Sequence, residues 1–197
     1  MKSKSLVLFV IIGLIVLLGG CGCNSYNGLV KGDQSVKNSW SNVETQYQRR
    51  TDLYNSVIKT IEGSANFEKS TLKEVLEARA KATSVTVNID DPQTLAQYQQ
   101  AQGQLQGAFS RLMAVAEAYP DLKTTQAFRD FQTQIEGTEN RINTARVDYN
   151  AQVNSYNLSV KTFPNSIFAG LFHFTEKAYY KADPGSDKAP DINFNIK

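Results

Sequence analysis

The sequence predicts an all-α protein: an elongated, antiparallel, up-and-down bundle of four helices, three long and one shorter, with an N-terminal signal or anchor and an irregular C-terminal tail. After residue 32, apolar side chains recur at steps of three and four, the spacing of helices that pack along a seam. Short breaks with proline and turn residues separate these stretches, which favours antiparallel neighbours. The chain begins with a basic and then apolar leader.

Residues 1–20 have the layout of a signal peptide, with a basic start, an apolar run and two glycines. The stretch "LGGC" that follows resembles the signature of bacterial lipoproteins, in which the cysteine thiol takes a diacylglyceryl group. The resemblance implies lipidation of Cys21, a tether over 21–32 and a membrane-anchored lipoprotein outside the cytoplasm. A thioether-linked diacylglyceryl group plus an acylated amine provides more than one chain, enough for stable anchoring.

Two alternatives to the lipoprotein signal remain open at the sequence level. One is an uncleaved single-pass anchor, although the run 6–18 covers only roughly 20 Å at about 1.5 Å per residue, against a hydrocarbon core of about 30 Å. The other is a chance cysteine after a hydrophobic stretch. The position of Cys21, directly after Gly-Gly at the end of the leader, favours the lipoprotein signal.

Charge gives no indication of a nucleic-acid partner. Cleavage before Cys21 would remove Lys2 and Lys4 from the 21 basic residues, leaving 19 against 19 acidic ones. No basic stripe interleaved with aromatic residues occurs in the remainder, so we expect no nucleic-acid binding. Cys23 would be the one thiol left without a lipid, which predicts neither a disulfide framework nor a cysteine metal site.

The bundle is expected over 33–163. The first helix, 33–64, has Asp33 or Ser35 as candidate caps, Gly63 as its end and a heptad seam of Val36, Trp40, Val43, Tyr47, Tyr54, Val57 and Ile61. A second, weaker stripe predicts a helix from Phe67 to Val87, which "NIDDP" at 88–92 ends.

The third helix is expected from Pro92 to Tyr119. Its glycines, Gly103 and Gly107, allow either the close approach of another helix or simply tolerated defects, each costing about 1 kcal/mol relative to alanine. After "YPDLK", a fourth helix should run from Thr124 to Phe163, some forty residues and roughly 60 Å long. Pro164 ends it, and the tail 164–197 is expected to fold back onto the bundle.

The fourth helix carries an unusual density of polar groups in "EGTENRINTARVDYNAQVNSYN", and the seam of the first helix contains Arg50. A buried arginine needs a partner, because an unpaired buried charge costs several kcal/mol. We therefore predict an interior network that fixes helix register and joins Arg50 to Glu139 or Glu136, with Arg79 or Arg146 nearby. The alternatives are a charged cleft that holds a ligand and a merely solvated face.

Seven stretches together resemble the LemA family of bacterial membrane-associated proteins, over the chain from about Tyr26 to its end. They are "YNGLV" at 26–30, Trp40 followed by "VETQYQRRTDL" at 43–53, "EVLEARAKA" at 74–82, "RLMAVAEAYPDLK" at 111–123, "EGTENRINTARVDYN" at 136–150, "YN" at 156–157 and "FP" at 163–164. The resemblance implies an N-terminal membrane anchor and a long antiparallel helical bundle. The molecular activity of the family is undefined, and some relatives are associated with membrane proteases or organelle-like membrane systems.

The chain departs from the family pattern in two places. Relatives commonly have Ile-Pro-Asn after the Asp-Leu of the first helix, where this chain has Tyr54-Asn55-Ser56. Many relatives keep a transmembrane helix, whereas this leader ends in a lipoprotein signature, so their sidedness does not carry over.

The sequence lacks the motifs of the common catalytic sites. It has one histidine, His173, in an aromatic segment where a packed or exposed side chain is the simplest interpretation, and Asp90-Asp91 fits a turn and helix cap. We expect no cofactor and no metal. The favoured function is a non-enzymatic, membrane-tethered interaction or scaffold protein with an unidentified envelope partner. The aromatic tail offers a possible contact surface for that partner: Ile167, Phe168, Leu171, Phe172 and Phe174.

Two other function classes stay open. One is a lipid or small-molecule sensor in which 167–174 opens, and the other is a cryptic hydrolase that uses the polar band at 136–146. An exposed apolar patch would favour partner or membrane contact. A closed cavity lined by Arg50 and Glu139 would favour a ligand.

Overall fold

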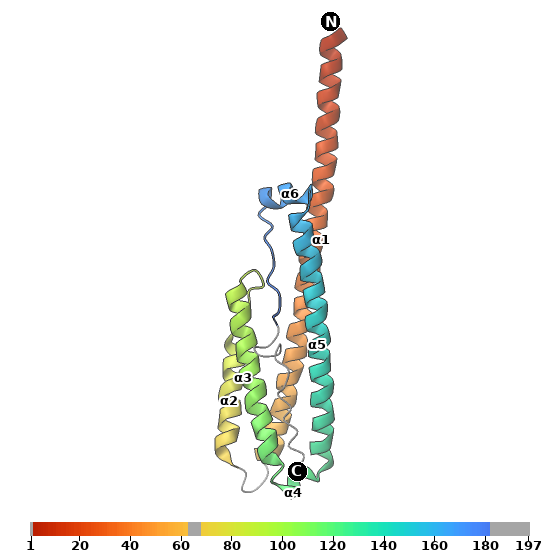
Figure 1. The fold of residues 1–197 in the computed structure, drawn as a ribbon. Coiled ribbons are helices and arrows are strands. Elements are labelled where there is room, and N and C mark those ends of the chain that lie inside the picture. The colour runs from red at the N-terminus through yellow and green to blue at the C-terminus, as the bar shows by residue number, and fades with distance from the viewer. Residues whose placement is uncertain (1, 63–67, 182–197) are drawn as a thin grey trace, which may run out of the picture. The chain divides into compact units, whose positions relative to one another are not determined.

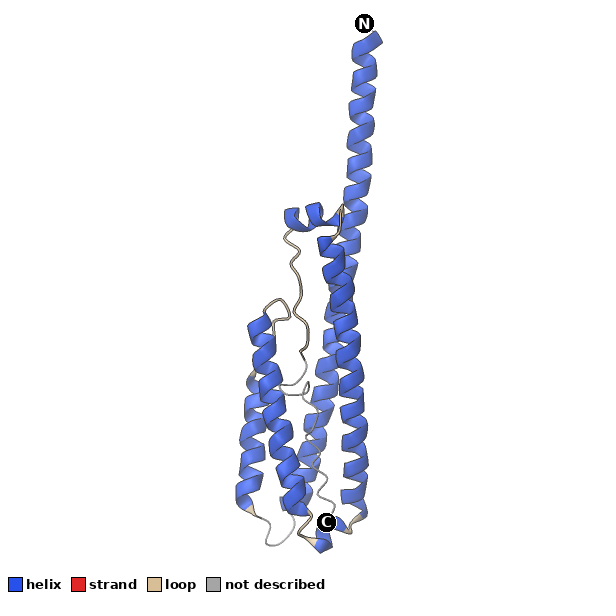
Figure 2. Ribbon diagram, viewed as in Figure 1, coloured by secondary structure: helices blue, strands red, loops and turns tan. Residues whose placement is uncertain are grey.

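The computed structural model describes residues 2–62 and 68–181 of the chain, and every regular element in this part is a helix (Figure 1, Figure 2). The helices are α1 (Lys2–Glu62), α2 (Lys69–Ser84), α3 (Pro92–Ala116), α4 (Pro120–Lys123), α5 (Gln126–Lys161) and α6 (Asn165–Leu171). The all-α class is therefore confirmed for the described residues. They form two compact units, Met1–Arg50 with Glu136–Tyr179 (unit 1) and Thr51–Ile135 with Tyr180–Lys197 (unit 2). The packing of four helices into a single bundle stays a prediction.

Helix α1 begins at Lys2, much earlier than the sequence predicts. Asp33 and Ser35 lie inside this helix, so their assignment as N-terminal caps is wrong. Residues 21–32 are helical too, and their role as a tether stays a prediction. The reason for the earlier start is visible in the burial pattern: Leu29 and Val36, seven residues apart, are both completely buried, so the seam continues toward the N-terminus past Asp33. The helix ends at Glu62, and Gly63 lies outside the described residues.

In unit 1, α1 and α5 run antiparallel along a shared apolar seam (Figure 1). Trp40 and Tyr149 meet edge to face with ring centroids 5.3 Å apart. Nearer the N-terminus of α1, a Cβ added at Gly32 would lie 3.0 Å from the Tyr156 ring, so a glycine at this position permits the close approach of α5. The buried seam residues are Leu29, Val36, Trp40, Val43 and Tyr47 from α1, and Ile142, Ala145, Tyr149, Val153 and Tyr156 from α5.

Unit 2 has its own apolar core, built from α2, α3, α4 and the adjoining parts of α1 and α5. The Tyr54 and Phe109 rings stack with centroids 3.6 Å apart. Helix α3 starts at Pro92 as predicted, and the Asp91 carboxylate caps it by accepting the backbone N–H of Gln93 at 2.8 Å. At Gly103 an added Cβ would meet nothing within 4 Å, so the close helix approach expected there is wrong.

The tail begins with a short helix rather than an irregular segment. Helix α6 ends where His173 takes a positive φ of 58°, the left-handed conformation that commonly terminates helices. The backbone N–H of Phe174 then donates to the Ala169 carbonyl at 2.9 Å and closes the turn. Residues 174–181 continue without regular secondary structure, and the rest of the expected tail, 182–197, lies outside the described residues.

Candidate functional site

The polar band of unit 1 centres on Arg50, whose side chain is only 1% exposed. Its guanidinium donates to Glu139 Oε1 at 3.3 Å, and the Glu139 side chain is 25% exposed. The guanidinium carbon also lies 4.7 Å from the centre of the Tyr47 ring, within the range of a cation–π contact. Arg50 is thus held by a carboxylate from α5 and a ring from α1.

The other residues of the predicted network take different positions. Arg146 donates to the Tyr47 hydroxyl, through Nε at 3.0 Å and also through a terminal nitrogen. Glu136 is exposed, and Arg79 lies on α2 in unit 2. Within unit 1 the structure therefore brings together Arg50, Glu139 and Arg146, with Tyr47 between the two arginines.

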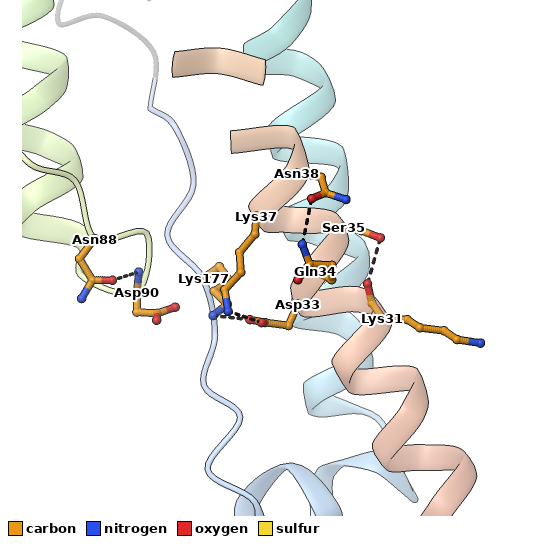
Figure 3. Close-up of polar contacts among 9 residues, drawn as sticks. All are labelled: Lys31, Asp33, Gln34, Ser35, Lys37, Asn38, Asn88, Asp90 and Lys177. Carbon is orange, nitrogen blue, oxygen red and sulfur yellow. Dashed lines mark hydrogen bonds and ion pairs between the residues drawn. The ribbon is translucent and has the colours of Figure 1, made fainter. Parts of the chain in front are cut away.

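A second polar cluster joins the tail to α1 (Figure 3). The Asp33 carboxylate forms two ion pairs, one with Lys177 Nζ at 2.7 Å and one with Lys37 Nζ at 2.7 Å. Burial raises the pKa of Asp33, but the hydrogen bonds and positive charges of Lys177 and Lys37 outweigh it, so the pKa lies below its ordinary value. The Lys177 side chain is 6% exposed, and its ammonium also lies 5.5 Å from the centre of the Tyr156 ring.

The tail backbone is fixed by side chains of α5. Asn157, 4% exposed, accepts the backbone N–H of Lys177 at 2.8 Å and donates to the Lys177 carbonyl at 2.9 Å. At the next residue of the tail, the Tyr149 hydroxyl donates to the Ala178 carbonyl at 2.8 Å. Asn157 thus satisfies both backbone polar groups of Lys177, which lies in a segment without regular secondary structure.

Sequence reasoning predicted that the tail folds back onto the bundle, but it did not identify the residues that hold the tail. The one sequence signal of this docking site was the excess of asparagines on α5, which we assigned to the interior network around Arg50. The pairing itself joins residues 20 positions apart through an extended segment that has no periodicity to recognise.

The third feature of unit 1 is an apolar surface on and around α6, the segment predicted to contact a partner. Ile167 and Leu171 are 61% and 66% exposed, and Phe172 is 47% exposed. Phe168 and Phe174 are half-buried. A Cβ added at Gly22 would lie 3.0 Å from the Phe168 ring, which places α6 against α1 next to Cys21. The side chain of Cys21 itself lies outside the described part of the structure.

His173 is exposed, and within 2–62 and 68–181 no three His, Cys, Asp or Glu side chains form a group that could hold a metal ion. A groove in unit 2 is lined mainly by α2 and α3 residues, and its lining includes neither Arg50 nor Glu139. Within the part of the chain that the structure describes, no helix is both long enough and apolar enough to cross a membrane.

Across residues 2–62 and 68–181 the regular structure is entirely helical, and the buried Arg50 and Lys177 side chains pair with Glu139 and Asp33 inside unit 1. Comparison with known families gives the particular assignment: the model of the LemA family matches residues 39–194. The chain belongs to the LemA family, as its sequence motifs predict.

Named relatives are identical to this chain at about a quarter of the aligned positions. Magnetosome protein MamQ 2 of Paramagnetospirillum magneticum is 25% identical over 181 residues, covering 82% of this chain and 66% of the relative. Protein LemA of Metamycoplasma hominis is 26% identical over 157 residues, covering 79% of this chain and 68% of the relative. Magnetosome protein MamQ of Magnetospirillum gryphiswaldense is 23% identical over 181 residues, covering 82% of this chain and 66% of the relative. The chain thus spans slightly less than two thirds of the length of the magnetosome relatives.

Proposed function

We propose that this protein is a membrane-tethered, non-enzymatic interaction or scaffold protein of the bacterial envelope, anchored through lipidated Cys21. The observation that carries the proposal is the position of Cys21. It follows Gly-Gly at the end of a basic and apolar leader, and it lies within α1, one residue before Gly22. A lipid on Cys21 would therefore be attached directly to the helix that forms unit 1, without a flexible spacer.

The polar groups of unit 1 support a non-enzymatic role. A catalytic acid or base must reach a substrate, yet the Arg50 side chain is 1% exposed and bonds to Glu139, and Lys177 is buried against Asp33. These charges hold helices and tail together, which is the behaviour of a rigid module that presents a surface. The names of the magnetosome relatives assign those proteins to an assembled bacterial structure, which agrees with a scaffold role for this chain.

The test of the tether is the intact mass of the protein after extraction from membranes. The wild-type chain should lack residues 1–20 and carry the mass of a lipid. Cys21→Ala should abolish both changes, whereas Cys23→Ala is the matched control, because Cys23 is a free, exposed cysteine two residues away. An unprocessed mass in the wild-type protein and both variants would refute the lipoprotein tether and favour a single-pass anchor.

The test of the partner is crosslinking in intact cells. A photoreactive residue at an exposed position of α5, such as Val147, should capture a discrete envelope protein from cells that carry wild-type Cys21. The same probe in the Cys21→Ala background should lose that product. Capture that is identical in both backgrounds would show that the tether does not determine which partners the protein meets.

A further inference from the structure

We propose that residues 162–175, which contain α6 and which we call the α6 loop, form a membrane-contact surface that lies in the bilayer interface beside the anchor. The proposal rests on the proposed membrane tether and adds a second, direct contact with lipid. It assigns a lipid surface, instead of a protein partner, to the apolar segment of the tail.

The α6 loop exposes an unusual amount of apolar surface for its length. Phe163 is 81% exposed, and Ile167 and Leu171, one helical turn apart on α6, are 61% and 66% exposed. Phe172 adds a ring that is 47% exposed. Single exposed apolar residues are ordinary, but four within one short segment form a patch of the kind that marks an interaction site.

The charge pattern of the α6 loop fits a lipid interface. The loop contains no Asp, Glu, Lys or Arg, and its one ionisable side chain is the imidazole of His173, so little charge has to be desolvated when it meets acyl chains. Charges begin immediately outside it: Lys161 and Glu176 form an ion pair of 2.8 Å across the base of the loop. Both side chains are about half exposed, so this pair can remain in the aqueous headgroup region while the apolar residues enter the lipid.

The location of the α6 loop favours contact with lipid over contact with a soluble partner. In unit 1, α6 crosses α1 beyond the end of α5 (Figure 1). The Phe168 ring would be 3.0 Å from a Cβ at Gly22, and Tyr26 meets Phe172 and Phe174 edge to face, with centroids 4.9 and 5.8 Å apart. Because Cys21 directly precedes Gly22, acyl chains attached there would enter the bilayer next to α6. A single-pass leader would place the same end of unit 1 at the membrane.

The test uses the full lipidated chain with a tryptophan placed on α6. Leu171→Trp adds a probe at an exposed position, and Val147→Trp is the matched control, because Val147 is 67% exposed on α5 and about 20 Å from its end at 1.5 Å per residue. The native Trp40 is 6% exposed and supplies a constant signal that the wild-type protein measures. Each protein is reconstituted into vesicles of phosphatidylethanolamine and phosphatidylglycerol, with or without brominated acyl chains, and floated on a density gradient.

Brominated lipid should quench the emission added by Leu171→Trp about twofold, because interfacial helices bury their apolar face about 5–10 Å deep. The emission added by Val147→Trp should not change. Protein that floats with both probes unquenched overturns the lipid contact, leaves the tether intact and assigns the patch to a protein. Protein that does not float overturns the tether and the lipid contact together.

Discussion

Replacing Asn157 by alanine should release the tail from unit 1 while the helices stay folded. The substitution removes both hydrogen bonds to the backbone of Lys177, at 2.8 and 2.9 Å, from a site where Asn157 is 4% exposed and Lys177 is 7% exposed. Each hydrogen bond contributes about 0.5–1.5 kcal/mol net. The free energy that holds the tail should therefore fall by about 1–3 kcal/mol, which raises the population of the open tail about 5- to 150-fold, at tenfold per 1.4 kcal/mol.

Limited proteolysis with trypsin measures this population, because Lys177 is buried in the docked tail and becomes a cleavage site when the tail opens. Lys181 is exposed in the docked state and serves as an internal reference for protease activity. The matched control is Asn154→Ala, since Asn154 is exposed and accepts a single, long hydrogen bond of 3.3 Å from Tyr179. Cleavage after Lys177 that rises less than about threefold in Asn157→Ala, or equally in both variants, would refute the docking energetics.

Three further predictions concern the two units. Arg50→Met should lower the free energy of unfolding by about 1–3 kcal/mol, because it removes the charge-assisted hydrogen bond to Glu139. Urea titrations of Arg50→Met, of a variant at Glu139 and of the double variant should give a coupling energy of about 1 kcal/mol between the two residues. The pKa of Asp33 is lowered in the folded protein, so its ion pair should hold the tail above about pH 4 and lose strength as the pH falls through the folded pKa. The NMR shift of the Lys177 amide should report this loss, which Asp33→Asn should abolish. Gly103→Ala should raise the free energy of unfolding by about 0.5–1 kcal/mol in urea titrations, because an added Cβ there meets nothing within 4 Å.

Each of these has an outcome that contradicts it. A coupling energy near zero between Arg50 and Glu139 would mean that the pair does not fix the helices. If the Lys177 amide shift changed with pH in the same way in Asp33→Asn, the change would come from a carboxylate other than Asp33. For the glycine, the matched control is Gly32→Ala, where a Cβ would lie 3.0 Å from the Tyr156 ring; equal stabilisation of both variants would contradict the close packing in unit 1.

The helical seams could be predicted because they depend on local periodicity. Val36, Trp40 and Tyr47 are spaced as heptad positions, and all three are buried as that spacing requires. The start of α1 was predicted wrongly because Asp33 was interpreted as a cap, although its carboxylate bonds to Lys37 and to Lys177 of the tail. A side chain that binds a distant segment cannot be distinguished from a cap by its sequence position alone.

The polar groups of α5 show the same limit. The position of Arg50 on a seam predicted a partner on the facing helix, but not which carboxylate, and the structure places Glu139 against it while Glu136 is exposed. Asn157 lies in the same polar stretch of the fourth helix but was given no role, and it binds the tail backbone. Backbone partners in an extended segment have no side-chain signature, so chemistry of this kind appears only when the fold brings the two segments together.

The docked tail fixes the position of the α6 loop, because it holds the end of the loop that does not continue from α5. The loop leaves α5 after Lys161 and returns to it at Lys177, where Asn157 holds the backbone and Asp33 holds the ammonium. Because both ends are fixed, the loop loses little additional conformational entropy when its apolar side chains contact a surface. Most of that entropy is already lost when the protein folds. A free tail would have to lose it on contact. Asn157 of α5 and Asp33 of α1 therefore give the exposed apolar surface a defined position beside Cys21.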